Sequence, residues 1–170
     1  YTNDMVVKMA QAAKWAGAVG IRANTPEQIR LIKENCDLPI IGLYKIWHED
    51  TDVFITPTLE ACREVWEAGA DIIALDCTSQ LTHEKTKAWD LLPIVKREIP
   101  EAIIFADVAN YAEARRAIDN GADIVAPTLY GYTEETKHIE GANMREFARM
   151  CRDFKDEAYV LMEGHIYTPE

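Results

Sequence analysis

Charged residues stand at the ends of short apolar runs, and Lys45 is the clearest case. It closes the run Pro39-Ile40-Ile41-Gly42-Leu43-Tyr44. Such a run between breakers is typical of a strand buried on both faces. Taking an ammonium group out of water favours its neutral form, which can serve as a base or a nucleophile. The sequence therefore allows two readings of Lys45: a chemical group in a largely apolar site, or a solvated lysine at a strand-to-loop junction.

Five further polar residues stand at corresponding places. The apolar runs around 18–22, 71–76, 102–107, 123–126 and 158–162 end in or next to Arg22, Asp76, Asp107, Thr128 and Glu163. A lysine, an arginine and three carboxylates suit proton transfer beside a carbonyl, with the arginine holding an anion or a hydroxyl. A structural role is the alternative for each of them, because strand ends are often polar and an aspartate there can cap the next helix.

Helical patterns separate these runs. The expected helices cover approximately residues 4–16, 26–38, 57–69, 82–98, 111–120 and 144–152. The start at Thr25-Pro26-Glu27-Gln28 is well marked, because it combines an N-cap threonine, a proline in the first turn and a glutamine placed for a capping box. Strict alternation of short apolar strands with helices indicates a parallel sheet.

An internal repeat narrows the fold class. Gly17, Gly69 and Gly121 stand 52 residues apart in similar sequence contexts, and each interval accommodates two βα units. Two interleaved series of strands are what a TIM (β/α)8 barrel needs, because alternate strands supply alternate interior layers. A dinucleotide-binding sheet is disfavoured, since the sequence has no GxGxxG motif.

Only six of the eight strands of such a barrel are found. The chain begins with a helix that no strand precedes, and it ends on Thr168-Pro169-Glu170, the signal that opens a helix at Thr25. We therefore expect residues 1–170 to form a single (β/α) barrel domain that is incomplete at both ends, with the first and last strands missing.

The composition excludes several kinds of partner. The 170 residues carry a net charge of −11, which argues against nucleic acid and against anionic membranes. No apolar run approaches the length of a membrane span. The four cysteines lack metal or redox spacing and indicate reduced thiols in the cytoplasm. The spacing of His48, Glu49 and Asp50 matches no ligand pattern, so we expect no metal.

Several runs resemble one enzyme family. These are residues 17–24, 54–58, 69–76, 131–133 and 163–166. In order and spacing they are similar to N-acylglucosamine-6-phosphate 2-epimerase, also called N-acetylmannosamine-6-phosphate 2-epimerase. The resemblance implies a cytoplasmic TIM-barrel isomerase that acts on a sugar phosphate in the use of sialic acid. It also implies deprotonation and reprotonation at C2, no cofactor, and a homodimer.

The resemblance and the strand ends together define a candidate site. The matched residues imply that Lys45 and Glu163 are catalytic and that Arg22 and Asp107 contact the sugar. The full set is catalytic Lys45 and Glu163, with Arg22, Asp107, Asp76, Thr128 and Gly164 as substrate-binding residues. We expect Lys45 to remove the C2 proton and Glu163 to assist ring opening or the second proton transfer. The phosphate-binding residues are expected in the missing eighth strand. Pro127 and Tyr130 depart from the family pattern.

Two other functions remain open from the sequence. An aldolase on the same kind of barrel would use Lys45 to form a Schiff base. A non-catalytic barrel that binds a sugar phosphate is the second alternative, and the presence of both Lys45 and Glu163 argues against it.

Overall fold

A single parallel sheet organises the chain. The computed structural model describes residues 2–139 and 141–167, and its six strands pair in the order β1-β2-β3-β4-β5-β6. The strands are β1 (Ile21–Asn24), β2 (Ile40–Leu43), β3 (Ile72–Asp76), β4 (Ile103–Asp107), β5 (Ile124–Ala126) and β6 (Tyr159–Val160). The helices are α1 (Asn3–Trp15), α2 (Pro26–Asn35), α3 (Leu59–Glu67), η1 (Ala88–Asp90, a 3-10 turn), α4 (Leu91–Glu98), α5 (Tyr111–Asp119) and α6 (Met144–Phe154).

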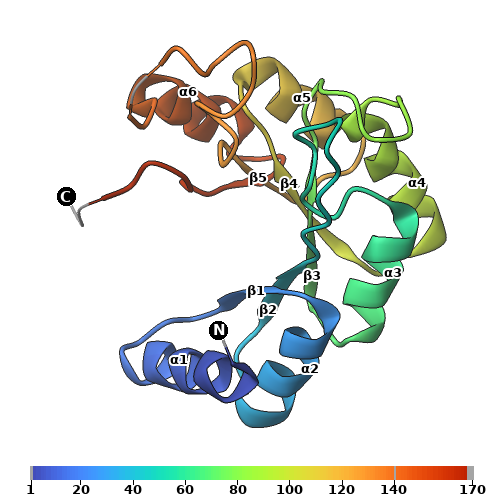
Figure 1. The fold of residues 1–170 in the computed structure, drawn as a ribbon. Helices are drawn as coiled ribbons and strands as arrows, with labels where there is room; N and C mark the ends of the chain where they lie inside the picture. The colour runs from blue at the N-terminus through green and yellow to red at the C-terminus, as the bar shows by residue number, and fades with distance from the viewer. Residues whose placement is uncertain (1, 140, 168–170) are drawn as a thin grey trace.

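The strands and helices form an open arc of a TIM-type barrel (Figure 1). Helices α2 to α5 follow the outer side of the sheet, and the last segment of the chain, drawn in red, crosses the open side. Each strand pairs in parallel with its sequence neighbours, as a barrel requires. The predicted parallel α/β architecture is confirmed.

The repeated glycines end three helices in the same way. Gly17, Gly69 and Gly121 follow α1, α3 and α5 with φ angles of 97°, 97° and 99°. A positive φ is strained for any residue with a Cβ, so glycine is favoured at each of these helix ends. The predicted helix start at Thr25 is also confirmed, because the Thr25 hydroxyl accepts the N–H of Gln28.

Side chains of alternate strand residues pack into two layers. The outer layer lies between the sheet and the helices and includes Ile73 and Leu75 of β3. The inner layer lies on the other face and consists of Leu43, Ile55, Ala74, Phe105, Ala109, Ile124, Ala126 and Leu129. Successive side chains of a strand point to opposite faces, so this alternation also decides which polar residues face the inside.

Several predicted boundaries are wrong, three of them clearly. The first strand covers Ile21–Asn24 rather than 18–22, because pairing with β2 begins at Ile21. Residues 82–87 form a turn in which the N–H of Thr82 donates to the carbonyl oxygen of Thr86 and the two threonine hydroxyls are hydrogen-bonded. Helix α4 therefore starts only at Leu91. The last strand is limited to Tyr159–Val160, which pair with β5. Within the described ranges, no helix is long and apolar enough to cross a membrane.

Candidate active site

The inner face of the sheet collects the predicted charged residues near the carboxyl ends of the strands. Ala23 packs into the outer layer, so its neighbour Arg22 points inward. Asp107 continues the inward series of β4 after Phe105, and Asp76 continues that of β3 after Ala74. The two aspartates are paired in register on adjacent strands. The carboxyl ends of barrel strands are where active sites lie, so this position supports a chemical role.

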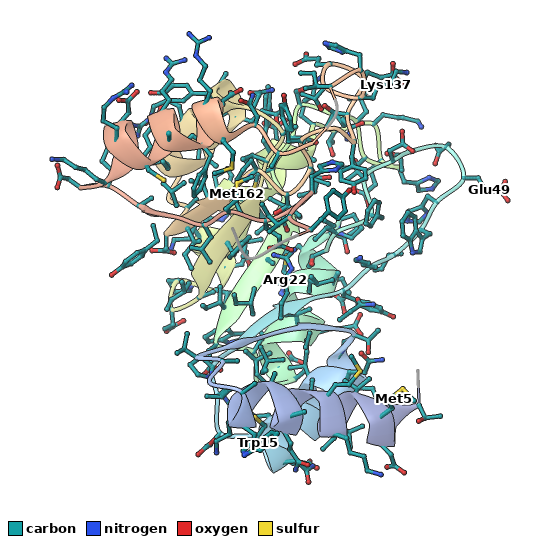
Figure 2. The ribbon with its side chains drawn as sticks, turned by 90° about the vertical axis from the view of Figure 1, so that its left-hand side faces the viewer. Met5, Trp15, Arg22, Glu49, Lys137 and Met162 are labelled. Carbon is teal, nitrogen blue, oxygen red and sulfur yellow. The ribbon has the colours of Figure 1, made fainter. Side chains whose placement is uncertain are left out.

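Arg22 joins two carboxylates that are far apart in sequence. Its guanidinium donates from Nη2 to Asp107 Oδ2 at 2.8 Å and from Nη1 to Glu163 Oε2 at 3.1 Å. The Arg22 side chain is 21% exposed, that of Asp107 is 0% and that of Glu163 is 36%. Arg22 lies at the centre of the molecule, next to the segment that carries Met162 (Figure 2). The guanidinium also lies 4.8 Å from the centroid of the Phe105 ring, which restricts its position.

Burial and charge shift the pKa values of this group in definite directions. Burial alone would lower the pKa of Arg22, but the neighbouring charges of Asp107 and Glu163 raise it, so the guanidinium is firmly cationic. Burial raises the pKa of the Glu163 carboxyl above its usual range, although the charges of Arg22 and Lys45 oppose this shift. A carboxyl of this kind carries a proton more readily near neutral pH than an exposed glutamate does.

Lys45 lies at the base of a hairpin that follows β2. It forms an antiparallel bridge with Ile55, and its backbone N–H donates to Asn24 Oδ1 at 2.9 Å. Its ammonium lies 5.5 Å from the centroid of the Phe54 ring. Of the two readings of Lys45, the solvated lysine at a strand-to-loop junction describes its surroundings better, because the residue as a whole is exposed on the open side of the sheet. Lys45 thus has Ile55 and Phe54 as apolar neighbours on the hairpin, and it is open to solvent as well.

The segment that carries Glu163 is fixed on the loop after β5. Gly164 has a φ of 91°, and a Cβ there would lie 3.0 Å from the carbonyl oxygen of Thr128, so the close approach requires glycine. His165 Nε2 lies 3.0 Å from the carbonyl oxygen of Tyr130, and its ring stacks on Tyr132. These contacts hold Glu163 at the rim although β6 itself is short.

A pocket of about 340 Å³ brings most of the candidate residues together. Its lining consists of Arg22, Leu43, Lys45, Phe54, Ile55, Thr128, Leu129, Tyr132, Glu163 and Gly164. Thr128 Oγ1 is buried and has no hydrogen-bond partner among the described residues. The pocket therefore offers cationic, acidic and hydroxyl groups beside an apolar wall.

Asp76 stands apart from this pocket. It is 3% exposed, and its Oδ1 accepts the N–H of Thr78 at 2.8 Å and the Thr78 hydroxyl at 2.6 Å. Burial raises the pKa of the Asp76 carboxyl to about 7, and the charges of Asp107 and Glu113 add to the shift. The Asp76 carboxyl does not border the pocket that Lys45 and Glu163 share. Asp107 is deeply placed as well, and it reaches the site through Arg22.

Several residues at the site were not predicted as site residues from the sequence. Asn24 holds the backbone of Lys45, and Phe54 and Tyr132 border the pocket. Asn24 was not predicted as a site residue because the first strand was expected to end at residue 22, whereas it extends to Asn24. With the observed register, the alternation of inward residues indicates Asn24 directly. Phe54 and Tyr132 lie on loops, where no periodicity signals their orientation. Their only sequence signal is that they stand in the runs 54–58 and 131–133, which resemble the family.

The arrangement suits acid–base chemistry on a small polar molecule. Lys45 and Glu163 border one pocket, and Arg22 lies between Glu163 and Asp107 as a fixed positive charge. Two proton-transfer groups beside a fixed cation can abstract a proton and stabilise the charge that develops. Among residues 2–139 and 141–167, no group of three His, Cys, Asp or Glu residues is placed to hold a metal ion.

Comparisons with known proteins identify close relatives of the chain. The family model "Putative N-acetylmannosamine-6-phosphate epimerase" matches residues 6–170. A Listeria monocytogenes protein named "Putative N-acetylmannosamine-6-phosphate 2-epimerase" is 42% identical over 164 residues, which cover 95% of this chain and 68% of the relative. The N-acetylmannosamine-6-phosphate 2-epimerase from Clostridium perfringens superposes with a TM-score of 0.88 at 30% identity, over 99% of this chain and 72% of that one. The 2-keto-3-deoxy-6-phosphogluconate aldolase of Zymomonas mobilis, at 16% identity and a TM-score of 0.64, shares the fold alone.

Proposed function

The chain belongs to the N-acetylmannosamine-6-phosphate epimerase family, and from this premise we propose that it interconverts N-acetylmannosamine 6-phosphate and N-acetylglucosamine 6-phosphate. The two sugars differ only in configuration at C2. The observation that carries the proposal is that Lys45 and Glu163 border one pocket. A change of configuration at one carbon needs a proton removed and a proton returned, and these two side chains supply the groups.

The proposed reaction proceeds on the open-chain aldehyde. The C2 proton is acidic there, because the electron pair of the broken C2–H bond moves toward C1 and places negative charge on the carbonyl oxygen. Lys45, acting as the neutral amine, removes this proton and becomes an ammonium. Glu163, whose pKa is raised by burial, handles ring opening or the return of a proton to C2. Return to the opposite face gives the epimer.

The neighbouring residues position the sugar in this proposal. Arg22 is held by Asp107 and Glu163 and presents a fixed cation to a hydroxyl or to the developing oxyanion. Thr128 and Gly164 line the pocket beside Glu163, and Gly164 lets the Glu163 segment approach the Thr128 backbone closely. Asp107 acts through Arg22.

The cellular setting is part of the proposal. The partner is a small sugar phosphate, which suits a step in the use of sialic acid and other amino sugars. The four cysteines form no disulfide, and this supports a reducing compartment such as the cytoplasm. A homodimer stays a prediction from the family resemblance.

Exchange of the C2 hydrogen tests the roles of Lys45 and Glu163. In deuterated water the unaltered protein should incorporate deuterium at C2 of both sugars, which NMR follows directly. Lys45→Ala should lower the exchange rate by about 10²–10⁴-fold, the usual contribution of a general base, and Glu163→Ala by a similar factor. Lys8→Ala, an exposed lysine on α1, is the matched control and should leave the rate unchanged.

Two outcomes would contradict this proposal. Retained exchange in Lys45→Ala would remove the role of Lys45 as the base. Covalent trapping of the substrate on Lys45 by borohydride would instead support a Schiff-base aldolase, since proton transfer leaves no imine to reduce.

A further inference from the structure

The hairpin after Lys45 forms one side of the pocket. Lys45 pairs with Ile55 and His48 with Thr51, and the N–H of Ile46 donates to the carbonyl oxygen of Phe54 at 3.0 Å. Its tip projects from the carboxyl end of the sheet, where Glu49 marks it in Figure 2. The Thr51 hydroxyl donates to the carbonyl oxygen of Leu81 at 2.6 Å and so fixes the hairpin on the loop after β3. The hairpin is thus anchored at its base and near its tip.

Two aromatic rings give this hairpin an apolar side. Trp47 and Phe54 stack with ring centroids 3.9 Å apart and an interplanar angle of 19°. Phe54 borders the pocket and also packs against the inner layer, whereas Trp47 is 66% exposed. Trp47 therefore supports Phe54 from outside, and Phe54 presents its ring to the pocket beside Lys45.

The pocket is divided by polarity. Arg22, Lys45 and Glu163 supply its charges, while Leu43, Phe54, Ile55 and Leu129 supply the apolar surface. A sugar phosphate is polar throughout except for the methyl group of its N-acyl substituent. That substituent is attached to C2, the carbon from which Lys45 removes a proton in the proposed reaction. In the proposed reaction the acyl group therefore lies near Lys45, whose Nζ is 5.5 Å from the centroid of the Phe54 ring.

We propose that Phe54, supported by Trp47, is the specificity-determining wall that receives the N-acyl group of the substrate. This inference rests on the proposed epimerase function and adds to it the part of the pocket that selects the acyl substituent. An apolar wall accepts acetyl, and it discriminates against an acyl group that carries a hydroxyl because that hydroxyl loses its water there. Replacing Phe54 by a smaller side chain should make room for a longer acyl chain.

Three substrates and three variants test whether Phe54 selects the N-acyl group. The substrates are mannosamine 6-phosphates that carry N-acetyl, N-propionyl or N-glycolyl groups, and kcat/KM is measured for each. Phe54→Ala should lower kcat/KM for the N-acetyl sugar by about 10–100-fold, with a smaller loss for N-propionyl, so that the propionyl-to-acetyl ratio rises at least about fivefold. Phe54→Leu keeps an apolar side chain of similar size and should lose less than about tenfold with N-acetyl. Trp15→Ala, on α1 and 91% exposed, is the aromatic control and should change nothing.

The outcomes separate this inference from the proposed function. If Phe54→Ala lowers kcat/KM equally for all three substrates, Phe54 does not select the acyl group, because such a loss would mean that it only positions Lys45. The same conclusion follows if Phe54→Leu, folded by circular dichroism, changes the acyl preference no less than Phe54→Ala does. If the unaltered protein turns over none of the three sugars, the epimerase proposal itself is contradicted, and so is the role of Phe54 in acyl selection, which depends on it.

Discussion

Arg22 is held by two carboxylates that come from contrasting parts of the sheet. Asp107 ends β4, a five-residue strand with a partner on each side, and its side chain is 0% exposed. Glu163 follows β6, a two-residue strand paired with β5, and its side chain is 36% exposed. The contact with Asp107 lies at the buried centre of the sheet, and the contact with Glu163 lies at its partly exposed edge.

The contrast separates positioning from proton transfer. A carboxylate that is buried and ion-paired is held in place, which suits a residue that orients Arg22. A carboxyl that is partly exposed, with its pKa raised by burial, can exchange a proton with solvent and with a ligand. The segment after β6 is therefore where a proton-transfer group is useful, provided that Gly164 and His165 hold it in place.

The largest expected effect on stability is at the central contact. Asp107→Asn keeps the shape of the side chain but removes the charge beside partly buried Arg22. Breaking such a pair from one side costs about 3–5 kcal/mol, and we expect the lower end because Glu163 remains. Urea unfolding measures the change. Glu98→Gln, which removes a charge from the exposed pair with Arg63, is the matched control and should cost about 0–1 kcal/mol. Equal losses in the two variants would contradict the contrast.

The next effect concerns Asp76, which lies beside Asp107 on β3. Its pKa is raised from 3.8 to about 7 on folding, so the folded chain binds its proton more tightly than the unfolded chain does. Stability from this group is complete below about pH 4 and falls as the pH rises toward about 7.

Asp76→Asn removes this dependence. The difference in unfolding free energy between the variant and the unaltered protein should move in favour of the variant between about pH 4 and pH 7, and urea titrations across this range measure it. A difference independent of pH would show that Asp76 is ionised throughout in the folded chain. Asp153→Asn is the control, because Arg152 lowers the pKa of this exposed aspartate. Between about pH 4 and pH 7, the unfolding free energy of the unaltered protein should not fall relative to that of this variant.

The smallest effect on stability is expected at the margin. Glu163→Gln should change the unfolding free energy by about 0–1 kcal/mol, because its contact with Arg22 is partly exposed. The same variant should nevertheless lose most of the C2 exchange activity. A loss of stability as large as that of Asp107→Asn would mean that the Arg22–Glu163 contact stabilises the fold as much as the buried Arg22–Asp107 contact does.

Much of the architecture was predictable from local patterns. The start of α2 at Thr25, the glycines after α1, α3 and α5, and the inward series that ends in Asp107 all follow from rules that act over a few residues. The end of β1 was misplaced because its limits depend on pairing with β2, which local propensity does not encode. The same error concealed Asn24, and the loop residue Phe54 had no periodic pattern to reveal it.

The sequence by itself determined the alternation of strands and helices, the family, and the residue types at the carboxyl ends of the strands. These depend on periodicity, caps and turns, which are local. Only the tertiary structure decided that Arg22 joins Asp107 and Glu163, which lie 85 and 141 residues away in sequence. It also decided that Asp76 is buried apart from the pocket and that Lys45 is exposed beside Phe54. Ion pairing and desolvation depend on which groups the fold brings within a few ångströms, so no local pattern contains them.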